Sequence, residues 1–139
     1  MILLDTSGLL AALFDDQRQH EECAQVLRDA EGPLILSPFV LAETDYLIQK
    51  YAGVKAEIMF LEDVERGAYE LENFRADDMR NMRIMVTRYK DLNIGITDAS
   101  LIVLADRYIC RDVLTLDVRH FRAMRPTTKK SFRILPADL

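Results

Sequence analysis

Two aspartates stand where they could bind a divalent cation. Asp5 follows the apolar run 1–4, and Asp117 follows the apolar segment 113–116. The carboxyl ends of parallel strands meet at one edge of a sheet, with neighbouring strands about 4.8 Å apart, so these two carboxylates are expected to approach each other. Like charges that close require a cation or a shared proton between them, and a cation is the better explanation. Thr115 lies on the same side of its extended segment as Asp117 and could donate a hydrogen bond to a carboxylate that holds the ion.

Two further acids belong to predicted helices. Glu43 lies three residues after Val40 and four before Leu47, so it is expected on an apolar face, where a carboxylate needs a partner. Asp98 follows Thr97, a possible cap, at the start of another helix, where the helix dipole favours negative charge. The four acids together offer hard oxygen ligands without a suitable His or Cys, which favours Mg²⁺ or Mn²⁺ over zinc.

Each of these acids also has an ordinary structural interpretation. Asp5 and Asp98 could act only as helix caps, and the hydroxyl residues after Asp5 could cap its helix instead. Glu43 could form a structural salt bridge. Asp117 could simply begin a turn. Taken singly, none of the four acids is specific, and the metal hypothesis rests on their combination.

The elements that must position these acids alternate between strand and helix. Strands are predicted over 1–4, 34–36, 69–71, 113–116 and 132–135, and helices over 9–14, 21–30, 38–51, 54–66, 77–90, 98–108 and 119–123. This pattern favours an α/β protein with a mostly parallel sheet of about five strands and helices on both sides. At 139 residues, the length predicts a single domain over residues 1–139.

Composition limits the class of protein. Half of the residues are hydrophobic, but the apolar runs are far shorter than a membrane-spanning helix requires. Asp5 interrupts the first apolar run and no basic region precedes it, so neither a secretory signal nor a membrane segment is expected, and a cytoplasmic protein is predicted. Cys23 and Cys110 lack metal-type spacing and are expected to be ordinary buried or half-buried residues.

Charge is distributed unevenly along the chain. Residues 1–72 carry 15 acidic and 5 basic side chains, whereas residues 73–139 carry 8 acidic and 13 basic ones. The basic residues near Asp98 and Asp117 are Arg107, Arg111, Arg119, Arg122, Arg125, Lys129, Lys130 and Arg133. A polyanion could bind the basic half and a basic peptide the acidic half; a solvated surface without a partner is the other interpretation.

Four segments carry a resemblance to a known family. They are Ile2-Leu3-Leu4-Asp5-Thr6-Ser7, Ala42-Glu43, Ile96-Thr97-Asp98-Ala99-Ser100 and Leu114-Thr115-Leu116-Asp117-Val118-Arg119-His120-Phe121. In their order and spacing they resemble the PIN domain, and the length and final motif resemble the VapC-type toxins of bacterial and archaeal toxin–antitoxin pairs. The resemblance covers nearly the entire chain, with no departure at the four acidic positions.

The resemblance implies an Mg²⁺- or Mn²⁺-dependent endoribonuclease. The acidic cluster would be Asp5, Glu43, Asp98 and Asp117, supported by Thr6 and Thr115. The resemblance also implies a homodimer and a partner antitoxin whose C-terminal segment covers a groove made by the early helices. Among the basic residues, Arg119, Arg122 and Lys129 are the candidates for contact with RNA phosphates.

Two other functions compete with this one. A phosphatase could use Asp5 as a covalent nucleophile, but the haloacid dehalogenase type that it would resemble has a second aspartate two residues on, where this chain has Ser7. No glycine-rich GK[ST] loop is present, which excludes a P-loop nucleotide hydrolase. A non-catalytic binding module is the second alternative, and the intact acids argue against it.

Overall fold

The computed structural model describes residues 1–128 and 130–139, so Lys129 lies outside the described residues. Five strands form one sheet in the order β3-β2-β1-β4-β5, and each neighbouring pair is parallel. The strands are β1 (Ile2–Leu4), β2 (Leu34–Leu36), β3 (Glu70–Leu71), β4 (Asp112–Leu114) and β5 (Arg133–Leu135). The predicted five-stranded, mostly parallel sheet is therefore confirmed.

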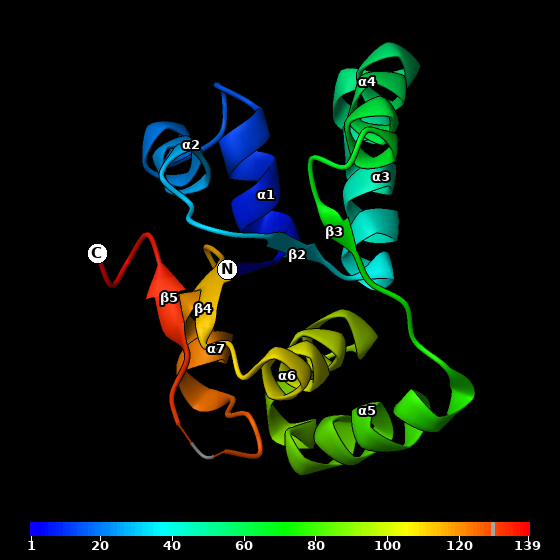
Figure 1. Ribbon diagram of the computed structural model, residues 1–139, viewed down its shortest axis with the longest axis vertical. Helices are drawn as coiled ribbons and strands as arrows, with labels where there is room; N and C mark the ends of the chain where they lie inside the picture. The colour runs from blue at the N-terminus through cyan, green and yellow to red at the C-terminus, as the bar shows by residue number, and fades with distance from the viewer. Residues whose placement is uncertain (129) are drawn as a thin grey trace.

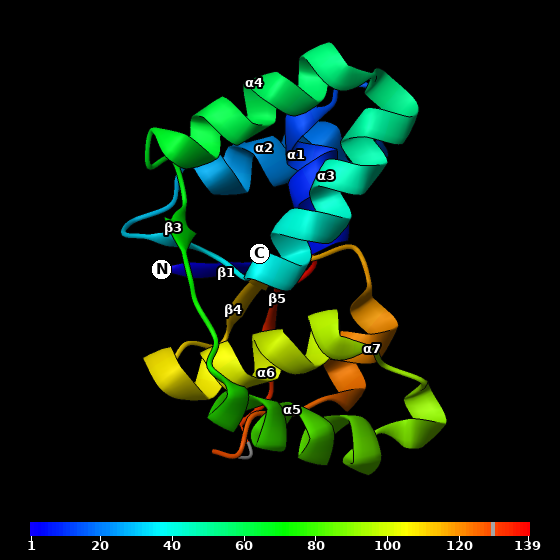
Figure 2. The same cartoon turned by 90° about the vertical axis from the view of Figure 1, so that its right-hand side faces the viewer.

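Helices cover both sides of the sheet, as predicted. Helices α1 to α4 lie on one side and helices α5 to α7 on the other (Figures 1 and 2). They are α1 (Thr6–Leu13), α2 (His20–Arg28), α3 (Pro38–Ala52), α4 (Val54–Glu65), α5 (Ala76–Arg88), α6 (Ile96–Tyr108) and α7 (Val118–Ala123), with a 3₁₀ turn, η1 (Lys90–Leu92), after α5. None of the described helices combines the length and the apolar character needed to cross a membrane.

Strand β1 lies at the centre of the sheet and is covered on both faces. Its residues Leu3 and Leu4 are completely buried, which explains the uninterrupted apolar run, because a parallel strand with helices on both sides has no solvated face. Asp5 comes directly after β1, and its backbone N–H donates to the carbonyl oxygen of Leu114 in β4 at 3.0 Å. The chain therefore leaves the middle of the sheet at Asp5.

Gly8 lets the first helix pack directly against the end of β4. A Cβ atom at this position would lie 2.4 Å from the carbonyl oxygen of Leu114, which no side chain tolerates. The absence of a side chain therefore brings the start of α1 next to the residues that follow β4. This close approach determines the geometry of the pocket described below.

The ends of several elements differ from the predicted ones. Strand β4 ends at Leu114, two residues earlier than predicted, although the N–H of Thr115 still donates to the carbonyl of Leu135 at 3.0 Å. The predicted cap of α6 by Thr97 is wrong, because the helix begins at Ile96 and Gly95 occupies the N-cap position. Thr97 thus lies inside the first turn, where its hydroxyl is available for a contact with another element.

Candidate active site

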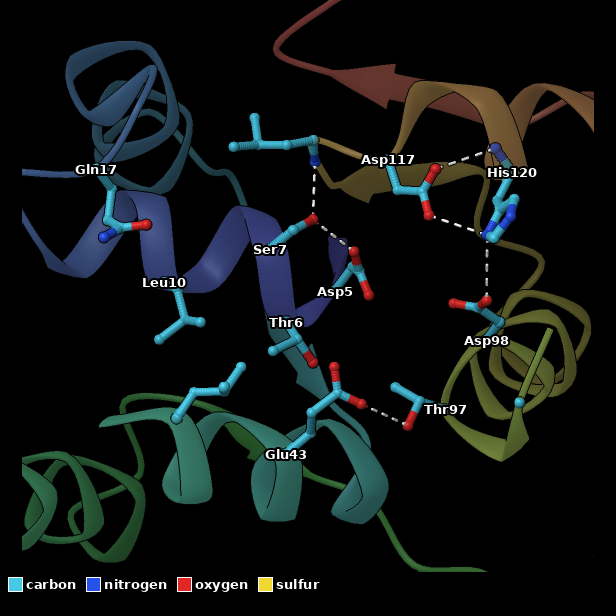
Figure 3. A pocket seen from close by; sticks show the side chains of 13 residues that line it. Asp5, Thr6, Ser7, Leu10, Gln17, Glu43, Thr97, Asp98, Asp117 and His120 are labelled. Atoms are coloured by element: carbon cyan, nitrogen blue, oxygen red, sulfur yellow. Dashed lines mark hydrogen bonds and ion pairs between the residues drawn. The ribbon is translucent and has the colours of Figure 1, made fainter. Parts of the chain in front are cut away.

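The four predicted acids line one open pocket of about 520 Å³ at the carboxyl edge of the sheet (Figure 3). They come from four separate places in the fold: Asp5 precedes α1, Glu43 lies on α3, Asp98 lies in the first turn of α6, and Asp117 precedes α7. The order of the strands explains this convergence, because β1 and β4 are neighbours and α3 and α6 border them from opposite sides.

Asp5 is the most buried of the four acids, with 6% of its surface exposed. Its Oδ2 accepts hydrogen bonds from the hydroxyls of Thr115, at 2.6 Å, and Ser7, at 2.7 Å. Burial raises the pKa of this carboxyl, against the lowering effect of those hydrogen bonds. Asp5 occupies the N-cap position of α1, but its side chain makes no capping hydrogen bond, so the capping role considered for it is not what the structure shows.

Ser7 connects the two strand ends that carry the aspartates. Its hydroxyl accepts the N–H of Leu116 at 2.9 Å and lies 3.1 Å from the hydroxyl of Thr115, which in turn accepts the N–H of Asp117 at 2.9 Å. The sequence suggested only a capping role for Ser7. Ser7 lies two residues after Asp5, on a helix that turns back over the neighbouring strand. This location is the signal that could have identified Ser7 as a link between the two strand ends.

Thr6 also lines the pocket, and it is 4% exposed. Its buried hydroxyl oxygen has no hydrogen-bond partner among the described residues. Burying an unpaired hydroxyl costs about 1–3 kcal/mol, so a polar ligand in the pocket would relieve this penalty.

Asp98 experiences the strongest effect of the neighbouring acids. Burial, and then the charges of the other pocket carboxylates, raise the pKa of Asp98 to about 6, against the opposing effect of His120. The side chain is 20% exposed. A cation bound between these carboxylates would lower those pKa values again.

His120 lies between two of the acids. Its Nδ1 is 2.9 Å from Oδ2 of Asp117 and 3.7 Å from Oδ2 of Asp98 (Figure 3). Asp117 also accepts the backbone N–H of His120 through Oδ1 at 3.2 Å, so it caps α7, whereas the alternative interpretation was that it begins a turn. In the sequence His120 is close to Asp117, which allows a contact with substrate, although a surface or packing role is the stronger interpretation from sequence alone; the structure places it in the pocket.

The expectation that Glu43 lies on a buried face is wrong. The buried residues of α3 are Val40, Thr44 and Ile48, spaced by four, which leaves Glu43 at the side of this face and exposed. Its Oε2 accepts a hydrogen bond from the hydroxyl of Thr97 at 3.1 Å, and Glu43 forms no ion pair with the residues that the structure describes. Glu43 therefore needs no salt bridge, because it points into an open, hydrated pocket.

The donor set suits a hard divalent cation. Carboxylate oxygens and a hydroxyl are the ligands that Mg²⁺ and Mn²⁺ prefer. As they lie, no three His, Cys, Asp or Glu side chains in the described part of the protein are close enough together to hold a metal ion. Asp117 is turned toward His120, so its side chain would rotate toward the centre of the pocket to reach an ion. Oε2 of Glu43 accepts from Thr97, which leaves the other carboxylate oxygen of Glu43 for a ligand.

The predicted phosphate contacts have different surroundings. Arg119 is exposed and makes no hydrogen bond or ion pair with the residues that the structure describes. Both terminal nitrogens of Arg122 contact the carboxylate of Asp138 near the C-terminus. Arg119 is therefore the more available of the two for RNA.

Comparisons with known proteins agree with this architecture. The family model of the PIN domain matches residues 2–125. The chain is 41% identical over 135 residues to a protein named ribonuclease VapC26 of Mycobacterium tuberculosis, covering 97% of this chain and all of that one.

The fold is also similar to a solved structure. The crystal structure of Mycobacterium tuberculosis VapC20, described as a sarcin-ricin loop cleaving toxin, matches with a TM-score of 0.81 at 18% identity, over 91% of this chain and all of the other. At that identity the match concerns the fold alone. The family match, the relative that is similar along its full length and the shared fold together place this chain in the PIN domain family.

Proposed function

We propose that this protein is an endoribonuclease that hydrolyses RNA phosphodiester bonds with a bound Mg²⁺ or Mn²⁺, as the toxin of a type II toxin–antitoxin pair. The observation that carries the proposal is the meeting of Asp5, Glu43, Asp98 and Asp117 in one open pocket. The 41% identity to a protein named ribonuclease supports the same activity. The pocket is open to solvent, as a site for a polymeric substrate requires.

The four acids would hold the ion, with Thr6 beside it. When bound, the ion supplies a more acidic water and stabilises negative charge on the phosphate. Ser7 and Thr115 fix Oδ2 of Asp5, which leaves the other carboxylate oxygen for the ligand. Asp98 must lose its proton to act as a ligand, and because its pKa in the metal-free protein is about 6, the affinity for the ion should fall as the pH falls below that value.

A groove next to the pocket supports an antitoxin as the partner. It lies between α1 and α3, has a volume of about 270 Å³, and shares Leu10, Gln17 and Leu47 with the acidic pocket. Phe14 and Tyr51 add further apolar surface to it. A peptide bound there would extend toward the acids and block the entry of RNA, and a basic peptide would complement the acidic first half of the chain.

A homodimer and a cytoplasmic location complete the proposal. Helix α4 exposes the apolar side chains of Val54, Ile58 and Met59, which a second copy could cover. The cytoplasm is where the protein would meet a cellular RNA substrate. The single contiguous core supports the proposal that residues 1–139 form one domain.

The alternatives are less well supported by the pocket. Asp5 is buried and its Oδ2 is occupied by two hydroxyls, whereas a phosphatase nucleophile must reach its substrate. A non-catalytic module would have no need for four acids whose mutual repulsion raises the pKa of Asp98.

The proposal is tested by incubating the protein with a mixed pool of structured RNA in Mn²⁺, Mg²⁺ or EDTA. Asp5→Asn and Asp98→Asn are prepared identically, with Asp77→Asn as a matched control, because Asp77 is an exposed acid on α5 outside the pocket. We expect metal-dependent cleavage by the parent and the control only. Equal cleavage by Asp98→Asn and the parent, or cleavage that survives EDTA, would contradict the proposed site.

A further inference from the structure

A buried pair of serines connects the two helices that carry Glu43 and Asp98. Ser37 caps α3 and Ser100 lies in the first turns of α6; both are completely buried, and their hydroxyl oxygens are 2.8 Å apart. The two residues are 63 positions apart in the sequence. They form a polar contact between helices on opposite sides of the sheet (Figure 2).

The direction of these hydrogen bonds follows from their partners. The hydroxyl of Ser100 donates to the carbonyl oxygen of Thr97 at 2.6 Å, so it can only accept from Ser37. The hydroxyl of Ser37 accepts the N–H of Phe39 at 3.2 Å. The three hydrogen bonds thus all run in one direction, from the first turn of α3 to the first turn of α6.

The connection returns to α3 through Thr97. The hydroxyl of Thr97 donates to Oε2 of Glu43 at 3.1 Å, and Glu43 lies six residues beyond the cap of α3. We call Ser37, Ser100, Thr97 and Glu43, with the N–H of Phe39, the α3–α6 network. The network contacts α3 at two points, the cap Ser37 and Glu43, and it holds the turn of α6 that contains Asp98 between these two points.

We propose that the α3–α6 network positions Glu43 and Asp98 for cation binding, with Ser37 and Ser100 as positioning residues. This inference rests on the proposed function of the pocket. The pocket then has two separately fixed halves, since Ser7 and Thr115 connect Asp5 to the segment of Asp117 in the same way. Loss of a group that orients ligating side chains typically lowers metal affinity or activity by roughly 10–100-fold.

Packing alone does not require the serine pair. Two apolar side chains of similar size would fill the same buried space without needing hydrogen bonds, and such double replacements are often close to neutral for stability. What the hydrogen bonds add is a fixed spacing and rotation between the two helices.

The test compares Ser100→Ala with Thr44→Val. Thr44 lies on α3, is completely buried, and its hydroxyl has no partner among the described residues, so its replacement removes a buried hydroxyl without touching the network. Calorimetry measures the dissociation constant for Mn²⁺, and urea unfolding of the metal-free protein measures stability. We expect Ser100→Ala to weaken Mn²⁺ binding about tenfold, while Thr44→Val binds Mn²⁺ as the parent does.

Substitutions at Thr97 give a second, independent readout. Thr97→Val removes the bond to Glu43 and is expected to weaken Mn²⁺ binding, whereas Thr97→Ser keeps the hydroxyl and is expected to restore it. If Ser100→Ala does not fold, Ser100→Cys keeps the size of the side chain while weakening the hydrogen bond.

Two results would contradict the inference in distinguishable ways. Ser100→Ala that unfolds at lower urea but binds Mn²⁺ as tightly as the parent would leave the network a purely structural role. A parent protein that neither binds Mn²⁺ nor cleaves RNA would overturn the proposed function, and this inference with it.

Discussion

At the scale of single residues, the pocket holds carboxylates that disfavour one another's charge. Asp98 shows this most clearly, because burial and the neighbouring acids raise its pKa to about 6. A carboxyl group whose pKa is higher in the folded than in the unfolded state stabilises the fold below its ordinary pKa. That stabilisation is lost as the pH rises toward the folded value. The charged Asp98 therefore lowers the free energy of unfolding of the metal-free protein at neutral pH.

Replacing Asp98 by Asn is expected to stabilise the metal-free protein. Above about pH 6 the gain is on the order of 1–3 kcal/mol, because the variant removes a partly buried charge among like charges. Below about pH 4 the two proteins converge, since Asp98 is then protonated. Urea unfolding in EDTA at a series of pH values measures this difference. An Asp98→Asn variant that is less stable than the parent at neutral pH would show that the carboxylate makes a favourable structural contact instead.

The sequence identified the acids and Thr115, which donates to Asp5, but not the other residues that hold them. Asp5 and Asp117 were predictable because each ends an apolar run, and parallel strands bring such ends together. Ser7, Thr97 and His120 were assigned capping or packing roles, because their partners lie on other elements and are invisible to local patterns.

At the scale of elements, most predicted strands and helices are confirmed to within a few residues. Glycine and proline explain this success, as at the cap of α3, where Ser37 precedes Pro38. The prediction that Glu43 is buried is wrong. Val40 and Leu47 indicate an apolar face that includes Glu43, but the buried face of α3 is formed by Val40, Thr44 and Ile48. A threonine in the core carries no hydrophobic signal, so the pattern pointed to the wrong side of the helix.

Gly8→Ala tests the close approach of α1 to β4. The added methyl would meet the carbonyl oxygen of Leu114, so α1 must move away from the strand, and we expect a loss of about 1–3 kcal/mol in unfolding free energy. The movement would also separate Ser7 from the N–H of Leu116 and disturb Asp5.

The matched control for stability is Gly95→Ala, where a Cβ atom would meet nothing within 4 Å. Urea unfolding and Mn²⁺ affinity are measured for both variants. Gly8→Ala with unchanged stability would mean that the two elements are not as tightly apposed as the structure indicates.

At the scale of the whole molecule, fewer basic side chains of the second half are available to bind RNA than the composition suggests. Arg107 pairs with Glu72 and Asp78, and Arg133 pairs with Asp112. These ion pairs stabilise the protein surface rather than offering charge to RNA. The sequence could predict the excess of cations but not which of them are neutralised by acids from distant parts of the chain.

Arg119 and Arg122 should therefore behave differently when replaced by alanine. Arg119→Ala is expected to weaken RNA binding and to lower the slope of log affinity against log salt concentration by about 0.7, the value for one phosphate contact with a single strand. Arg122→Ala should leave that slope unchanged and reduce stability, because it loses the contact with Asp138. Binding titrations at several salt concentrations separate the two effects. An unchanged slope in Arg119→Ala would remove it from the RNA interface.

The proposed function depends most directly on whether the four acids of the pocket together bind a divalent cation. Electron paramagnetic resonance of Mn²⁺ measures this, because the signal of the free ion decreases as the protein binds it. At a pH above 7, the account predicts saturable binding by the parent and by Asp77→Asn, and a severe loss of binding in Asp98→Asn. Equal binding by all three proteins, or no binding by the parent, would contradict it.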